Sequence, residues 1–212
     1  MRYRYCCLFL IMMFSLFQVS CGSQPGSPGS EGDTGIILDS VVTPSYNGTS
    51  TYSVDVFQEL CDPGPPPVFE IFTDHSAVLD IVATPMNPLL DVQPGDLYVE
   101  EYTIDYYRSS DSVGAPPIVS DRRYMSFTIP APTPGGSSSV TTTVVLVDLP
   151  RKDRYGTDML SGQFSSALGS SAFAYLNNYT AVYTFYGKNA FGTHFSFTAT
   201  TFFQIGSFDY CS

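Results

Sequence analysis

Residues 98–108 read YVEEYTIDYYR and residues 179–186 read YTAVYTFY, and these two stretches decide the fold. In both, apolar or aromatic side chains recur at alternate positions, with an interruption at Glu100, and this is the period of a β-strand that buries one face. We predict that both stretches are central strands of a sheet whose aromatic rings form the core. The side chains expected to face that core are Tyr98, Tyr102, Ile104, Tyr106, Tyr179 and Tyr183.

The same alternation recurs along the chain between connectors rich in proline and glycine, such as residues 62–67 and 130–136. Proline there blocks ladder pairing, so these connectors are loops. The pattern predicts an all-β fold, an antiparallel sandwich of about seven to nine strands. One short helix is expected near residues 158–164. The remaining predicted strands are residues 36–43, at a sheet edge, and residues 52–56, 77–83, 124–129, 140–149 and 193–205.

Residues 102–108 resemble the third (C) strand of fibronectin type III and related immunoglobulin-like domains, and residues 179–192 are similar to their F strand and F–G turn. The resemblance covers residues 52–208 and implies that residues 52–56 are the first (A) strand. It also implies that the predicted helix lies in a long E–F connection. Tyr179 would be the corner tyrosine of the family, whose hydroxyl ties the E–F loop back to the strand.

The first twenty residues have the parts of an export signal. Arg2 and Arg4 form a basic start, and residues 6–17 (CCLFLIMMFSLF) form an apolar run of twelve, shorter than the about 20 residues of a membrane-spanning helix. The following Gln18-Val-Ser-Cys21 resembles the lipobox of bacterial lipoproteins, although leucine is usual in place of Gln18. The resemblance implies that Cys21 receives diacylglycerol and becomes the new N-terminus.

Residues 22–35 (GSQPGSPGSEGDTG) cannot bury a core and suit a flexible tether between a lipid anchor and a folded domain. The chain is thus divided into a signal peptide (1–20), a tether (21–35) and one sandwich domain (36–212). An ordinary signal peptide cleaved nearby and a retained anchor helix remain alternatives. In the lipoproteins that the signal resembles, Asp after the lipidated cysteine favours the inner membrane, so Gly22 implies the outer membrane.

Cys61 and Cys211 are the cysteines left for the domain, because Cys6 and Cys7 lie in the signal and Cys21 would be acylated. An exported protein meets oxidising conditions, so the two are predicted to form a disulfide. The connectivity of the sandwich supports this pairing independently. Cys61 follows the proposed A strand, Cys211 follows the last strand, and these two strands end at the same pole.

The chain is acidic. Its net charge is −11, and removal of the signal leaves seven basic against twenty acidic residues, a net charge of −13. Such a surface repels phosphate backbones, so nucleic-acid binding is not expected.

We expect no enzyme, no cofactor and no metal. His75 and His194 stand at strand starts, where a structural hydrogen bond is the default, and the sequence has no G-x-S-x-G, C-x-x-C or phosphate-binding glycine pattern. Glu100 and Glu101 are neighbours on a strand and should point to opposite faces, which prevents a hydrolytic pair. A calcium site is conceivable, but the acids match no EF-hand spacing and are expected to be solvated. These acids are Asp91, Asp96 and Glu100.

Three connectors should cluster at the pole opposite the disulfide: residues 84–96, 130–139 and 187–192. The first contains apolar residues without a core register, which either form an exposed contact patch or cap the core. These candidate binding residues are Met86, Leu89 and Leu90. Exposed tyrosines such as Tyr107 and Tyr186 could also contribute to a binding face.

The expected function is that of a lipid-anchored protein of the cell envelope that binds or scaffolds a protein or glycan partner and has no enzymatic activity. The alternative, from a different class, is an envelope hydrolase or an accessory carbohydrate-binding protein. An acidic cleft with two carboxylates about 5–9 Å apart would favour hydrolysis. A surface with shallow hollows would favour binding.

Cys21→Ser should abolish lipidation, because the serine hydroxyl cannot take the thioether-linked lipid. Radiolabelled palmitate fed to an expressing bacterium is expected to label the wild type and not the variant. Equal labelling of both would exclude the anchor at this position.

Overall fold

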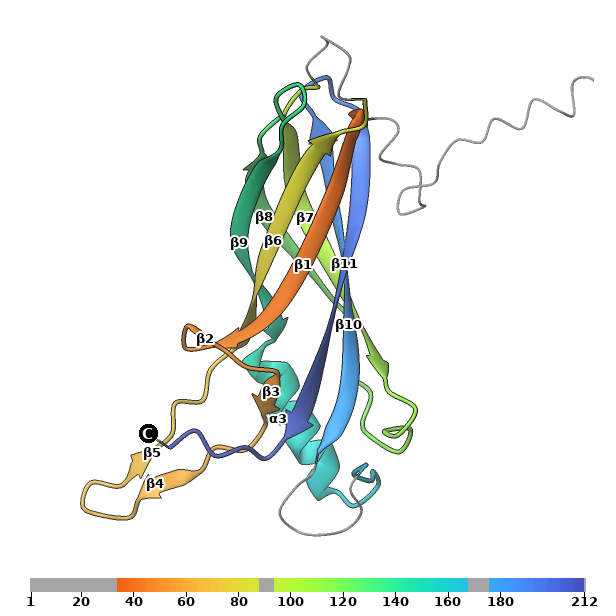
Figure 1. Ribbon diagram of the computed structural model, residues 1–212. Helices are drawn as coiled ribbons and strands as arrows, with labels where there is room; N and C mark the ends of the chain where they lie inside the picture. Colours follow the sequence, from red (N-terminus) through yellow and green to blue (C-terminus); the bar gives the residue numbers. More distant parts are fainter. Residues whose placement is uncertain (1–33, 88–93, 168–175, 212) are drawn as a thin grey trace, which may run out of the picture.

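The computed structural model describes residues 34–87, 94–167 and 176–211, and shows two twisted sheets packed face to face (Figure 1). The predicted all-β sandwich is confirmed. The first sheet has the strand order β2-β1-β6-β9. It consists of β1 (Ile36–Tyr46), β2 (Thr49–Ser50), β6 (His75–Pro85) and β9 (Ser138–Val147). The second has the order β3-β11-β10-β7-β8. It consists of β3 (Ser53–Asp55), β7 (Leu97–Arg108), β8 (Asp121–Ile129), β10 (Asn177–Asn189) and β11 (His194–Gly206).

The A strand of the sandwich is β1, and the prediction that residues 52–56 fill this role is wrong. β1 pairs antiparallel with β6 over ten residue pairs, from Ile36↔Pro85 to Ser45↔Ser76. Residues 52–56 are too few to form this pairing. Residues 53–55 form β3 instead, which runs parallel to the end of β11. β1 is an edge strand, as predicted, apart from the two residues of β2 that pair with its end.

The predicted core tyrosines are buried with one exception. Tyr102, Ile104, Tyr179 and Tyr183 are at most 3% exposed, and Tyr106 is partly buried against them. Tyr98 is 44% exposed, because the pairing register shifts between Val99 and Glu101 and the alternation changes phase there. Leu97 and Val99 face inward on one side of this shift, and Tyr102 and Ile104 do so on the other.

A glycine on the neighbouring strand makes this irregularity possible. The β7–β10 register shifts between Tyr186 and Gly187. A Cβ atom at Gly187 would lie 2.1 Å from the Tyr98 carbonyl oxygen, far inside contact distance. The alternation predicted for residues 98–106 therefore breaks at Glu100, because the strands approach closely at Gly187 and the register shifts there.

Three tyrosine hydroxyls cross the interior to the backbone of β9, the edge strand of the opposite sheet. The Tyr183 hydroxyl donates to the Val145 carbonyl (3.0 Å), and the Val145 N–H donates to the Tyr102 hydroxyl (3.1 Å). The Tyr106 hydroxyl donates to the Leu146 carbonyl (2.6 Å). The rings thus fill the core while their hydroxyls satisfy backbone groups of an edge strand.

Tyr179 has a different role from the corner tyrosine that the resemblance implied. Its hydroxyl donates to the carbonyl of Pro116, in the loop between β7 and β8. The register explains this, because Tyr179 pairs with Arg108 at the end of β7 and so stands beside the loop that follows. The E–F connection contributes a side chain, that of Tyr155, whose ring meets Tyr179 edge-on with centroids 6.0 Å apart and whose hydroxyl interacts with that of Tyr179.

The one helix in the described ranges is α3 (Leu149–Leu160), earlier than the predicted residues 158–164. Asp148 caps it by accepting the Arg151 N–H (3.2 Å), and Pro150 occupies the first turn, where a missing N–H costs nothing. The prediction extended β9 to Leu149 and missed this start signal. Gly162, with φ +72°, follows the end of the helix.

Cys61 and Cys211 form the predicted disulfide, with Cα atoms 5.3 Å apart. Cys61 lies in a small two-stranded hairpin of β4 (Leu60–Asp62) and β5 (Val68–Phe69), which projects at the lower end of Figure 1. β1 and β11 both end at this end of the sandwich, so the argument from a shared pole holds even though the A strand was misassigned. No helix among the described residues is long and apolar enough to span a bilayer.

Tyr183→Ala should destabilise the fold by about 3–5 kcal/mol, because it empties a fully buried aromatic site and removes a bond to the opposite sheet. Tyr183→Phe keeps the ring and should cost only about 1 kcal/mol. Urea denaturation of both variants measures the difference. A loss below about 0.5 kcal/mol for Tyr183→Ala would contradict its burial.

Candidate functional site

The two ends of the sandwich differ in character. We call the end that carries the Cys61–Cys211 bond and α3 the disulfide pole, and the opposite end the loop pole. The predicted meeting of three connectors at the loop pole is observed. The Ala190 N–H donates to the Asp96 carbonyl (2.9 Å), and the Ala131 N–H donates to the Asp96 carboxylate (2.8 Å).

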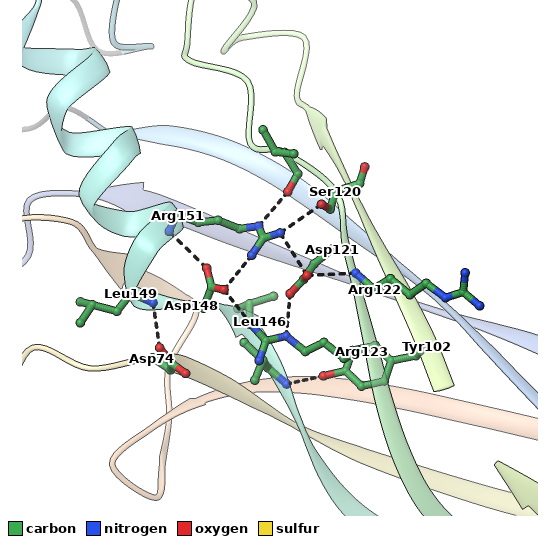
Figure 2. Close-up of polar contacts among 12 residues, drawn as sticks. Asp74, Tyr102, Ser120, Asp121, Arg122, Arg123, Leu146, Asp148, Leu149 and Arg151 are labelled. Carbon is green, nitrogen blue, oxygen red and sulfur yellow. Dashed lines mark hydrogen bonds and ion pairs between the residues drawn. The ribbon is translucent and has the colours of Figure 1, made fainter. Parts of the chain in front are cut away.

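At the disulfide pole, an ionic network fastens α3 to the sandwich (Figure 2). Asp148 accepts from both Arg123 and Arg151 at 2.7 Å, and Asp121 contacts the same two guanidinium groups at 2.6 and 3.1 Å. Arg151 also donates to the carbonyls of Val119 (2.8 Å) and Ser120 (3.1 Å), before β8.

Burial works against ionisation of Asp121, but the hydrogen bond from Arg123 and the charges of Arg151 and Arg123 lower its pKa below the ordinary value. The network therefore stays charged and internally neutral, with two acids and two bases. Each of its groups is engaged by another, which makes it a structural clamp.

A second cluster of polar side chains is more deeply buried in the domain, between α3, β3 and the C-terminal segment. Lys152 is fully buried on α3, and its ammonium lies 5.0 Å from the ring centroid of Tyr46 and 4.9 Å from that of Phe72. Its nitrogen has no hydrogen-bond partner within the described part of the chain. Burial lowers the pKa of Lys152 to about 8, although Asp55 and other nearby acids oppose this shift.

Two buried carboxyl groups hold the C-terminal segment beside this lysine. Asp55 accepts the Phe208 N–H (2.9 Å), and Glu70 accepts the N–H groups of Glu59 and Tyr210 (3.0 Å each). Burial raises the pKa of Asp55, and the adjacent Glu70 carboxylate raises it further. The Asp55 carboxyl group is therefore protonated more readily than an ordinary aspartate.

His75 completes the cluster as a neutral, structural residue, in agreement with the expectation from sequence. It is fully buried, stacks on Tyr46 with centroids 5.2 Å apart, and its Nε2 lies 3.4 Å from the Thr51 carbonyl. Burial, with the charge of Lys152, lowers the pKa of His75 to about 4. The other histidine, His194, is exposed at the start of β11.

Glu70, Asp209 and Cys211 bring potential ligand atoms within 4.8 Å of one another. Cys211 is committed to the disulfide, and both oxygens of Glu70 already accept backbone N–H groups. This group is therefore a poor metal site.

A hollow of about 410 Å³ opens beside this buried region, where Tyr52, the end of β11, the start of β10 and the β7–β8 loop meet. Tyr52 and Phe202 stand at its rim, 54% and 67% exposed. The Gln204 amide donates to the Asn178 side-chain oxygen (3.1 Å), and the Asn178 amide donates to Asp111 (2.7 Å). We call this site the aromatic hollow. A second, more apolar hollow of about 270 Å³ lies between residues 117–119 and α3.

The residues of the aromatic hollow were missed from sequence, because they come from four separate segments. The only available signal was the outward position of Phe202 and Gln204 on a strand whose other face is buried. Tyr107, one of the tyrosines considered for a binding face, is 56% exposed and lies across Thr180 from Phe202 in the strand register.

The candidate binding loop is described only in part. Met86 is exposed, and its N–H donates to the Gly35 carbonyl (2.9 Å). Leu89, Leu90 and Asp91 lie outside the described residues, as does Cys21.

The acids considered for calcium or hydrolysis have other partners. Glu100 lies 3.2 Å from the Lys188 ammonium on β10, and Glu101 lies 2.7 Å from the Arg122 guanidinium on β8. The two carboxylates thus turn to different neighbouring strands, and they do not form a pair.

No protein-family model matches this chain, and no curated protein sequence matches it significantly.

Asp55→Asn should be more stable than the wild type by about 1–3 kcal/mol at about pH 8, and equal to it at about pH 4. Asn keeps the acceptor for Phe208 and offers an N–H toward Glu70. The folded-state pKa of Asp55 is raised, so the stability from its protonated form is complete below about pH 3.9. That contribution is lost as the pH rises through the folded-state pKa.

Denaturant unfolding of both proteins across this pH range measures the effect. A difference in stability that does not change with pH would show that Asp55 titrates normally. Asp55→Leu, which loses the acceptor as well, should be destabilised at every pH.

Proposed function

We propose that this protein is a lipid-anchored, non-enzymatic component of the cell envelope that binds a partner through its disulfide pole. The observation that carries the proposal is the position of the domain's first strand. β1 begins at the loop pole, where Ile36 pairs with Pro85 and Gly35 bonds to Met86. A tether ending at residue 35 therefore attaches at the end opposite to both hollows. Figure 1 shows β1 beginning at the upper end, whereas α3 and the end of β11 lie at the lower end.

The dimensions support this orientation. A Gly/Ser-rich chain of fourteen residues, the length of segment 22–35, has a root-mean-square span of about 20 Å. β10 has thirteen residues and is about 40 Å long. With Cys21 in a membrane, the loop pole would lie near the lipid surface, and the disulfide pole would project from it. An outer-membrane location belongs to the same proposal and rests on Gly22 after the lipidated cysteine.

This orientation changes the role suggested for the candidate loop. Met86 and its neighbours would stand beside the membrane surface, where a partner in solution has less access. The aromatic hollow, at the other pole, is open to such a partner. We therefore favour the disulfide pole as the binding end.

The lining of the aromatic hollow supports binding over hydrolysis. Among the described residues that line it, Asp111 is the one carboxylate, and it is engaged by the Asn178 amide. Glycoside hydrolysis by the usual route needs two carboxyl groups across the scissile bond.

Single cysteines labelled with a fluorophore at the two poles test the orientation. Ser137→Cys reports on the loop pole and Gln163→Cys on the disulfide pole; both side chains are exposed. In lipidated protein reconstituted in vesicles with nitroxide headgroups, quenching is expected to be strong at position 137 and weak at position 163. The same labels on a Cys21→Ser background should show no quenching. Equal quenching at both positions would refute the proposed orientation.

A further inference from the structure

We propose that the aromatic hollow binds a neutral saccharide, with Phe202 and Tyr52 as the stacking surfaces and the Gln204–Asn178–Asp111 chain as the hydrogen-bonding floor. The inference rests on the proposed function, in that it names the class of partner that the disulfide pole receives. It adds a ligand chemistry that the orientation of the domain does not by itself imply.

The aromatic side chains at this site are exposed in the part of the chain that the structure describes, Phe202 to 67% and Tyr52 to 54%. Phe202 lies on the outer face of β11, whereas the residues before and after it, Thr201 and Phe203, are buried on the inner face. Across the strands it is in register with Thr180 and then Tyr107. One exposed aromatic residue is ordinary, but two exposed rings, those of Phe202 and Tyr52, line one hollow, and Tyr107 is exposed on the same face of the sheet. Such a group of aromatic side chains is typical of a binding surface.

The floor is held in place before any ligand arrives. Gln204 donates to Asn178 and Asn178 donates to Asp111, so the orientation of both amides is set by these bonds. The backbone supports the same groups, because the Gln204 N–H donates to the Tyr52 carbonyl (2.7 Å) and the Ser109 N–H donates to the Asn178 carbonyl (2.9 Å). Preorganised polar groups lower the entropy that binding costs.

The floor also keeps hydrogen-bonding capacity for a ligand. Within the residues that the structure describes, no group donates to the side-chain oxygen of Gln204. Ser110 adds a hydroxyl to the lining, and the Asp111 oxygen that takes the Asn178 amide has a further lone pair. Acceptors and a hydroxyl that line the same hollow suit neighbouring hydroxyl groups of one sugar ring.

The combination of surfaces selects the ligand class. A pyranose ring has a face of C–H groups that packs on an aromatic ring and an edge of hydroxyls that needs amide and carboxylate partners. The hollow offers both, and its volume of about 410 Å³ falls within the range of small-ligand sites. Asp111 and the chain's net charge of −11 disfavour phosphate, sulfate and uronate groups, because no lysine or arginine lines the described hollow to offset them.

Titration calorimetry on the mature lipidated protein tests the inference. The probes are neutral tetrasaccharides of glucose, galactose, mannose and N-acetylglucosamine, each supplied at millimolar concentration. At least one is expected to bind, and Phe202→Ala should weaken its Kd by tenfold or more. Asn178→Ala should weaken it similarly, since it removes the centre of the floor.

Phe191→Ala is the matched control, because Phe191 is also a strongly exposed phenylalanine (79%) but lies between β10 and β11 at the loop pole. It should leave the Kd unchanged. Absence of binding for all four probes, or an equal loss in Phe191→Ala and Phe202→Ala, would overturn the saccharide assignment. The quenching experiment has an independent readout, so failure of the saccharide leaves the orientation of the domain to be decided separately.

Discussion

The bonds from Tyr102, Tyr106 and Tyr183 to the backbone of β9 hold the two sheets in a fixed relation. A sandwich held only by apolar contact can slide, because hydrophobic attraction has no direction. Hydrogen bonds to defined backbone atoms do have a direction, and here they set β9 against β7 and β10. The position of the end of β9 then fixes Asp148, and with it the start of α3.

The disulfide pole is built outward from that point. α3 is clamped through Asp148 and Arg151, and its buried face covers the Lys152 cluster. The clustered carboxyl groups hold the C-terminal segment, which the Cys61–Cys211 bond ties to the projecting hairpin. Buried charges are expensive, and one amine with no hydrogen-bond partner among the described groups is tolerated here only because aromatic rings and nearby acids offset part of the cost. The frame that results supports Tyr52, at the edge of the aromatic hollow.

The distribution of features along the long axis gives the proposed function its physical basis. The loop pole, where β1 begins, carries connectors that bond to one another, as Asp96 does to Ala131 and Ala190. The other end carries two hollows, a projecting hairpin and exposed aromatic rings. In the proposed function, an anchor at the N-terminus would bring the loop pole toward the membrane and leave the disulfide pole to meet a partner.

Period-two alternation was sufficient to predict the sandwich, most of its strands and the burial of Tyr102, Ile104 and Tyr183, because the burial of one sheet face is encoded locally. The cysteine count was sufficient for the disulfide. Three features were not predictable, since each depends on what lies on a neighbouring strand. They are the change in alternation at Glu100, the choice of β1 as the A strand, and the hydrogen-bond partner of Tyr179. Gly187 is an example, for its close approach to the Tyr98 carbonyl exists only after β7 and β10 pair.

The start of α3 could have been predicted from Asp148 and Pro150, but this signal in the sequence was missed. The aromatic hollow belongs wholly to the tertiary structure, because Tyr52, Asp111, Asn178 and Phe202 are far apart in the chain and only strand register brings them to one surface.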